Sequence, residues 1–186
     1  LGFPFSVSEE FQKRNTNKSI IDSLKTVEEI QNLSVKNNKE LVVYLSMAFG
    51  NLYGENYHPD IVAELTQKLH QLEIKIIALS DTIGVSEPDN IVPLFNTLIT
   101  EYPPIEFGAH FHTTPDKWEE KVDSAYKNGC RRFDSAIKGY GGCPMAEDDL
   151  TGNMPTEKLI SYFTEDSGLN MQELEKSIEM SSSVFL

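Results

Sequence analysis

The feature that most constrains the fold is an alternation of short apolar runs with amphipathic segments between residues 41 and 137. Four runs rich in β-branched and other apolar residues have the pattern of strands, at 41–46, 74–79, 105–112 and 131–137. Their starts are roughly 25 to 35 residues apart, which leaves room for one crossover helix between parallel neighbours. The sequence therefore predicts an α/β fold built on a parallel sheet.

The segments around these runs have the caps and the apolar spacing of helices. Pro59 can open one helix as an N1 proline, and Gly129 can end another as a C′ glycine. Apolar residues recur at spacings of three and four within these segments, so each helix would bury one face. We expect helices that begin at Ser19, at Pro59, at Pro88, after Thr114-Pro115, and at about Pro155 and Asn170.

Four strand–helix units amount to half of a (β/α)8 TIM barrel. We expect the chain to cover about the second half, strands 5–8 with their flanking helices. Residues 1–15 would be the tail of the strand 4 region and its loop, 16–165 the half barrel, and 166–186 a C-terminal helix. The N-terminus reads as a cut end, so roughly a hundred further residues are expected upstream, judged from typical barrel lengths. The alternative is a flavodoxin-like open sheet, whose ligand loops would be shorter than residues 138–154.

Charge and composition narrow the function. A formal net charge of −13 repels a phosphate backbone, so no nucleic-acid partner is expected. No apolar run approaches the ~20 residues that span a bilayer, so no membrane segment is expected. The two cysteines are too few for a disulfide framework and fit a reducing compartment, so we expect a cytoplasmic protein.

The sharpest local motif is His110-Phe111-His112. Successive side chains on a strand point to opposite faces, so both imidazoles would lie on one side and Phe111 on the other. In a barrel the carboxyl end of the strands is the catalytic face. The motif therefore predicts half of a metal site, although two polar residues that cap a strand end remain the structural alternative.

The other expected strands also end in polar or glycine-rich segments. Tyr44 lies on the first strand, and Asp81 follows the second. Cys143 lies in the glycine-rich segment Gly139–Pro144 after the fourth, where a backbone can approach a ligand closely. An exposed cysteine of this kind suits proton transfer or redox chemistry, whereas Cys130 is expected to be a small buried residue.

Three segments in order carry a resemblance to a known family: Leu79–Val85, His110–Thr114, and Gly141–Pro144 with Thr151-Gly152-Asn153. Together they resemble the signature segments of the 3-hydroxy-3-methylglutaryl-CoA lyase family, a branch of the metal-dependent, pyruvate-carboxylase-like barrel superfamily. The resemblance runs from about Ser6 to Phe163. The run 145–150 departs from the family pattern: it is acidic and about one residue longer than the family's usual loop, which has small residues and a glycine there.

The resemblance implies a metal-assisted retro-Claisen cleavage of an acyl-CoA, with Mg2+ or Mn2+ as the cofactor. It makes His110, His112 and Asn153 metal ligands, and places the remaining ligand, an Asp beside a catalytic Arg, upstream of this chain. Catalytic roles would fall to Cys143, His110 and Asp81. Substrate contacts are expected from Tyr44, Asp81 and Gly142. Glu157 is expected to stabilise the Asn153 loop without contacting the metal or the substrate.

Three other possibilities remain open at this stage. A Claisen-condensing synthase of the citramalate, homocitrate or isopropylmalate type, or a hydroxy-keto-acid aldolase, would share the His-x-His motif, because fold and metal site alone do not fix the reaction. The chain could also be a catalytically inactive half-barrel fragment. Exposed strand edges would then need cover, so we expect as partners the missing N-terminal half of the barrel and further copies in a homo-oligomer.

Overall fold

The computed structural model describes residues 1–142, 151–163 and 168–184. Five parallel strands form its sheet in the order β1-β2-β3-β4-β5. They are β1 (Gly2–Ser6), β2 (Val42–Ser46), β3 (Ile76–Asp81), β4 (Glu106–Thr113) and β5 (Arg132–Phe133). A short strand β6 (Gly152–Asn153) pairs antiparallel with the end of β4, with Asn153 opposite His112. The prediction of an α/β fold with a parallel sheet is confirmed.

The helices alternate with the strands, as the apolar spacing predicted. They are α1 (Glu9–Thr16), α2 (Ile20–Lys36), α3 (Pro59–Gln71), α4 (Pro88–Glu101), α5 (Trp118–Lys127), α6 (Thr156–Tyr162) and α7 (Met171–Val184), with a 3-10 turn η1 (Ile137–Gly139). The residues expected to begin these helices do so in the structure. The Ser19 side chain accepts a hydrogen bond from the Asp22 amide, and Pro59 and Pro88 each open their helix.

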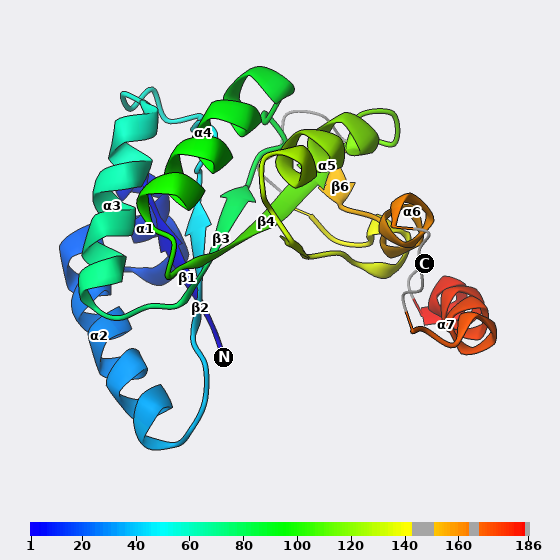
Figure 1. The fold of residues 1–186 in the computed structure, drawn as a ribbon, viewed down its shortest axis with the longest axis horizontal. Coiled ribbons are helices and arrows are strands. Elements are labelled where there is room, and N and C mark those ends of the chain that lie inside the picture. The colour runs from blue at the N-terminus through cyan, green and yellow to red at the C-terminus, as the bar shows by residue number, and fades with distance from the viewer. Residues whose placement is uncertain (143–150, 164–167, 185–186) are drawn as a thin grey trace.

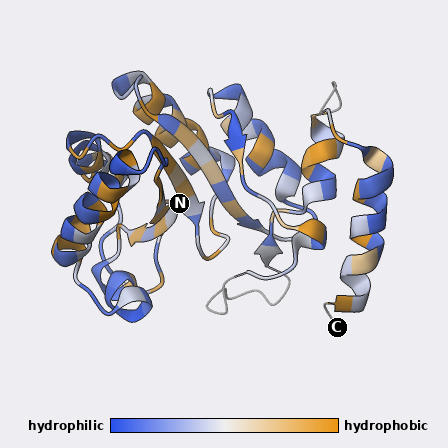
Figure 2. Cartoon of the chain, turned by 90° about the horizontal axis from the view of Figure 1, so that it is seen from below, coloured by the Kyte–Doolittle hydropathy of each residue, from blue (hydrophilic) through white to orange (hydrophobic). Residues whose placement is uncertain are grey.

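Helices α2 to α6 cover one face of the sheet. A single core joins Phe5, Val43, Ile77 and Phe111 of the strands to residues such as Leu94 of the helices. Figure 1 shows these helices beside the strands, with α7 at the opposite end of the molecule from α2. In Figure 2 the helices carry hydrophobic and hydrophilic residues in alternating bands, as amphipathic helices do.

The opposite face of the sheet carries a small second cluster of Val42, Ile76, Ala78 and Tyr44. Strands in sequential order with the helices packed on one face are the wrapping of a (β/α) barrel. A flavodoxin-like sheet has the strand order 2-1-3-4-5, so that alternative is excluded by the observed order.

Two local expectations need correction. The fourth predicted strand, 131–137, is only Arg132–Phe133, because the following chain leaves β4 and pairs Ala136 with the segment around Met154 and Pro155. The expected loop at 7–15 is largely helix α1, because the Ser8 side chain caps it by accepting from the Phe11 amide. The helix expected after Thr114-Pro115 is present as α5, which begins at Trp118.

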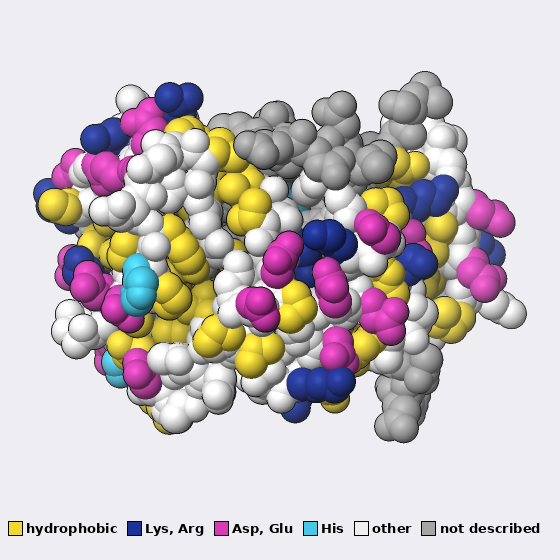
Figure 3. Space-filling model, turned by 90° about the horizontal axis from the view of Figure 1, so that it is seen from above, with side chains coloured by type: hydrophobic (Ala, Val, Ile, Leu, Met, Phe, Trp, Pro, Cys, Tyr) yellow, Lys and Arg dark blue, Asp and Glu magenta, His cyan; other side chains and the backbone are white. Residues whose placement is uncertain are grey.

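On the face shown in Figure 3, basic side chains lie close to acidic ones rather than in a separate field. Ion pairs within one helix join Lys13 to Glu9 and Lys127 to Asp123. Among the described residues, no helix is both long and apolar enough to cross a membrane.

Candidate functional site

The candidate site lies at the carboxyl ends of the strands and centres on β4. His110 and His112 alternate with the buried Phe111, which packs into the core against Phe49 and Phe95. The two imidazole rings therefore share the other face of the strand, with their centroids 5.5 Å apart. Strand periodicity and the anchoring of Phe111 thus set the direction of both rings.

The protein holds His112 in one orientation. Its Nδ1 lies 2.9 Å from the carbonyl oxygen of Thr82, in the turn after β3. A carbonyl only accepts, so Nδ1 carries the proton and Nε2 keeps its lone pair, on the ring that also contacts the Asn153 side chain. Burial lowers the pKa of His112, and the hydrogen bond to Thr82 opposes that shift. The ring is therefore a neutral nitrogen donor at neutral pH.

His110 is more exposed and has different neighbours. Its Nδ1 lies 3.3 Å from the Asp134 carboxylate, and its ring meets that of Tyr44 edge-on with centroids 5.5 Å apart. Burial and then Asp134, which accepts a hydrogen bond from the phenol, raise the pKa of Tyr44. Asp134 thus links the two aromatic side chains and leaves Nε2 of His110 pointing away from its carboxylate.

Asn153 reaches the histidines through β6. Its side-chain amide nitrogen donates to the Tyr140 carbonyl at 2.8 Å, and its side chain contacts His112. This approach requires glycine in the facing loop: a Cβ on Gly141, whose φ is +83°, would lie 2.9 Å from the Asn153 amide nitrogen. The amide nitrogen is thus held by Tyr140, and the amide oxygen, on the His112 side, is the atom that can bind a cation.

These three side chains fit a divalent cation as a partial site. Each has one polar atom fixed by the protein, at Thr82, Asp134 or Tyr140, and one lone-pair donor left over. Imidazole nitrogen with amide oxygen suits Mg2+, Mn2+ or Zn2+. Within the described part of the chain, no three His, Cys, Asp or Glu side chains gather as a metal site, so the amide oxygen is needed as third donor.

The expected substrate and catalytic role of Asp81 does not fit the structure. Asp81 is 1% exposed, and both carboxylate oxygens are occupied. Oδ1 accepts from the Val85 amide, while Oδ2 accepts from the Ser86 amide and hydroxyl and from the Lys121 ammonium at 2.8 Å. With its hydrogen-bonding capacity used inside the protein, Asp81 holds its turn together instead of facing a substrate.

The remaining predicted residues belong to the loop after β5. Cys143 lies outside the described residues. Gly142 is exposed, with φ +142°, and packs beside the backbone of Thr151 and Gly152. Glu157 accepts a hydrogen bond from the Lys138 amide at 3.0 Å, so it fixes the start of the loop that carries Tyr140.

Sequence reasoning missed two residues. Asp134 lies two positions after Arg132, on the alternation that places side chains on the histidine face, and this spacing was available in the sequence. Lys121 interrupts the apolar stripe of Trp118, Val122 and Ala125 on α5, which was a second available signal.

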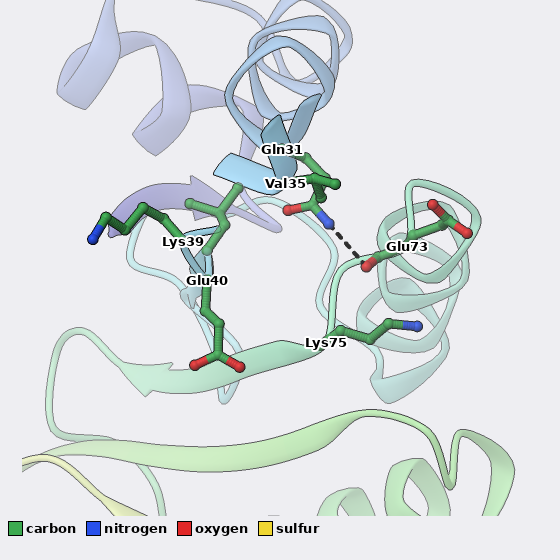
Figure 4. A pocket seen from close by; sticks show the side chains of 7 residues that line it. Gln31, Val35, Lys39, Glu40, Glu73 and Lys75 are labelled. Carbon is green, nitrogen blue, oxygen red and sulfur yellow. Dashed lines mark hydrogen bonds between the residues drawn. The ribbon is translucent and has the colours of Figure 1, made fainter. Parts of the chain in front are cut away.

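A cavity of about 220 Å³ lies at the other end of the sheet, where β2 and β3 begin. Figure 4 shows its lining of mixed charge, including Lys39, Glu40, Glu73 and Lys75, with Gln31 donating to the Glu73 carbonyl. None of the predicted site residues lines it.

Known proteins with similar sequences and folds point to one family. The family model described as HMGL-like matches residues 2–182. The human cytoplasmic 3-hydroxy-3-methylglutaryl-CoA lyase is 34% identical over 165 residues, which is 89% of this chain and 44% of that protein. The chain spans about half the length of the curated relatives it matches.

Solved structures agree. The HMG-CoA lyase of Bacillus subtilis superposes with a TM-score of 0.90 at 26% identity, over 98% of this chain and 62% of that one. An HMG-CoA lyase from Acinetobacter baumannii, solved in complex with coenzyme A and 3-methylmalate, gives a TM-score of 0.79 at 27% identity over 89% of this chain and 53% of that one.

Proposed function

The chain belongs to the HMGL-like family, and on that premise we propose that it is part of a carbon–carbon lyase that cleaves 3-hydroxy-3-methylglutaryl-CoA to acetyl-CoA and acetoacetate. The observation that carries the proposal is the meeting of His110, His112 and Asn153 at the carboxyl end of β4. The relatives named as lyases and the relative bound to coenzyme A support an acyl-CoA substrate.

The reaction would remove the proton of the C3 hydroxyl and break the C2–C3 bond. The bonding electrons pass to C2 as the thioester enolate, which then takes up a proton to give acetyl-CoA. Held by His110, His112 and Asn153, Mg2+ or Mn2+ would supply Lewis acidity for the cleavage. His110 would take part in the first proton transfer, with Asp134 holding its ring, and Cys143 would serve the second.

The other side chains would orient the substrate and shape the site. Tyr44, beside His110, would contact substrate through its phenol. Gly142 would let the backbone approach the thioester, and Glu157 would keep the Asn153 loop in place through Lys138. The described residues supply three neutral donors, so we propose that an upstream Asp and Arg complete the charge of the site.

That incompleteness extends to the barrel itself. We propose that the chain forms about the second half of a (β/α)8 barrel in the cytoplasm, completed by an N-terminal half and assembled as a homo-oligomer. Among the described residues, β1 and β5 each pair with a strand on one side only, which supports a partner, since unpaired strand edges are normally covered.

The test is an assay of a protein that includes the upstream sequence. Acetoacetate release from 3-hydroxy-3-methylglutaryl-CoA should require Mg2+ or Mn2+ and fall at least a hundredfold in His110→Ala, whereas His70→Ala, on the outer helix α3, should retain activity. Condensation of acetyl-CoA with a 2-oxo acid, in place of cleavage, would assign the protein to the synthases instead. This chain alone should turn over little substrate, and robust turnover by it would contradict the incomplete site.

A further inference from the structure

Lys121 is buried where a lysine is seldom found. It lies on α5 with a fully buried side chain, and its ion pair with Asp81 is the one pair of the described residues in which both side chains are 0% exposed. Burying an ammonium group is unfavourable unless it is paired and hydrogen bonded. Such a residue needs a reason beyond packing against the sheet.

Its three hydrogen bonds go to three different segments around the candidate site. The ammonium donates to Asp81 Oδ2 at 2.8 Å, to the Gly84 carbonyl at 3.1 Å and to the His112 carbonyl at 2.8 Å. These acceptors lie at the end of β3, in the turn that follows it, and at the end of β4. One side chain therefore joins the two strand ends.

That turn also carries the acceptor of the His112 ring. Thr82 lies between Asp81 and Gly84, and its carbonyl receives the Nδ1 proton of His112. Lys121 thus holds the backbone of His112 directly. Through Asp81 and Gly84, it also holds the turn on both sides of Thr82, to which the His112 ring is bonded. Movement of either segment would break the hydrogen bond that leaves Nε2 free.

We propose that Lys121 is a positioning residue of the metal site, which keeps His112 in its Nδ1–H tautomer with Nε2 directed at the cation. Metal binding by His112 rests on the proposed function, whereas the tautomer does not. A purely structural Lys121 would instead stabilise the fold and leave the His112 ring unaffected by its removal.

The chemistry of the site explains why lysine occupies this position. An ammonium group presents three donors from one atom, which matches three acceptors at 2.8–3.1 Å. Methionine has a similar length but no donor. Removing Lys121 alone leaves the Asp81 carboxylate buried without its counter-charge, so the test uses a neutral pair.

The experiment compares Asp81→Asn with Asp81→Asn/Lys121→Met in the protein that includes the upstream sequence. The single variant keeps the lysine bonds to the two carbonyls, and the double variant loses them. Lys127→Met is the control, since Lys127 lies on the same helix and its ion pair with Asp123 is exposed. Long-range 1H–15N NMR reports the His112 tautomer, and titration with Mn2+ reports affinity.

We expect the Nδ1–H tautomer of His112 in the wild type, in Asp81→Asn and in Lys127→Met, and its loss in the double variant. Mn2+ affinity should fall about 10-fold or more in the double variant relative to Asp81→Asn, as for other groups that orient a metal ligand. An unchanged tautomer and an affinity within about twofold in a folded double variant would overturn the proposal.

A second measurement needs no substitution and covers the case of a double variant that does not fold. Because coupling between sites is reciprocal, Mg2+ binding should shift the Lys121 ammonium resonance and slow its proton exchange. A Lys121 resonance that does not respond to bound Mg2+ would also overturn the proposal. If neither Mn2+ nor Mg2+ binds while the tautomer follows Lys121, the metal assignment fails and the positioning of His112 stands.

Discussion

Replacing Lys121 by methionine in this chain should lower the free energy of unfolding by about 3–5 kcal/mol, the usual cost of breaking a buried ion pair from one side. Across 2.8 Å at an effective dielectric constant of about 20, the gross attraction between Lys121 and Asp81 is about 6 kcal/mol. The substitution removes that attraction, relieves the burial of the ammonium, and leaves the Asp81 carboxylate with amide and hydroxyl donors only.

The double variant Asp81→Asn/Lys121→Met should cost less than the two single variants added together. It leaves no uncompensated charge, and its main penalty is the pair of buried carbonyls at Gly84 and His112, at roughly 1–3 kcal/mol each. Urea unfolding followed by circular dichroism at pH 7, with a chelator present to exclude stabilisation by metal, gives all four stabilities of the cycle. A loss below about 1 kcal/mol for Lys121→Met, or strictly additive single variants, would refute the description of this pair as a coupled buried unit.

Three further outcomes are expected. Gly141→Ala should weaken Mn2+ binding about 10-fold or more, because the new Cβ would lie 2.9 Å from the side-chain amide nitrogen of Asn153. Gly54→Ala is the control: Gly54 also has a positive φ, +68°, but a Cβ there meets nothing within 4 Å, so metal affinity should not change. Asp134→Asn should reduce Mn2+ affinity by a similar factor, because the amide would form a weaker hydrogen bond with His110 than the carboxylate does. An unchanged affinity in the same titration would contradict this role of Asp134. Burial raises the pKa of Cys130 to about 12, so iodoacetamide at pH 9 should label this thiol in urea but not in the native protein. The free energy of unfolding should also fall as the pH rises from the ordinary cysteine pKa towards 12, because the unfolded thiol loses its proton first.

Much of the fold was predictable because it depends on local periodicity. The strand and helix repeats and the proline and serine caps gave the element order and the parallel sheet. The prediction failed at helix α1, whose local Ser8 cap was overlooked, and at the fourth strand, where tertiary contacts override a local pattern. The apolar run at 131–137 ends as a strand at Phe133, because the chain then bonds to the Met154 segment, a partner that only the folded chain supplies.

The site shows the same division. Alternation along β4 is enough to put His110 and His112 on one face, and the glycines of the following loop indicate a close backbone approach. By the same reasoning, the position of Asp81 at the end of a strand predicted that it would contact the substrate. Its actual partner is Lys121, 40 residues away on α5, and nothing in the local sequence around Asp81 indicates that contact.

Most of the helices and strands, their order, and the side chains of a given strand that share a face could be predicted from the sequence, because these follow from backbone geometry over a few residues. The tertiary structure alone decided which polar groups meet. Asn153 reaches His112 through the antiparallel pairing of β6, and Asp134 faces His110 from the residue that follows β5. Contacts between residues so far apart in the chain depend on how whole elements pack, which no local pattern encodes.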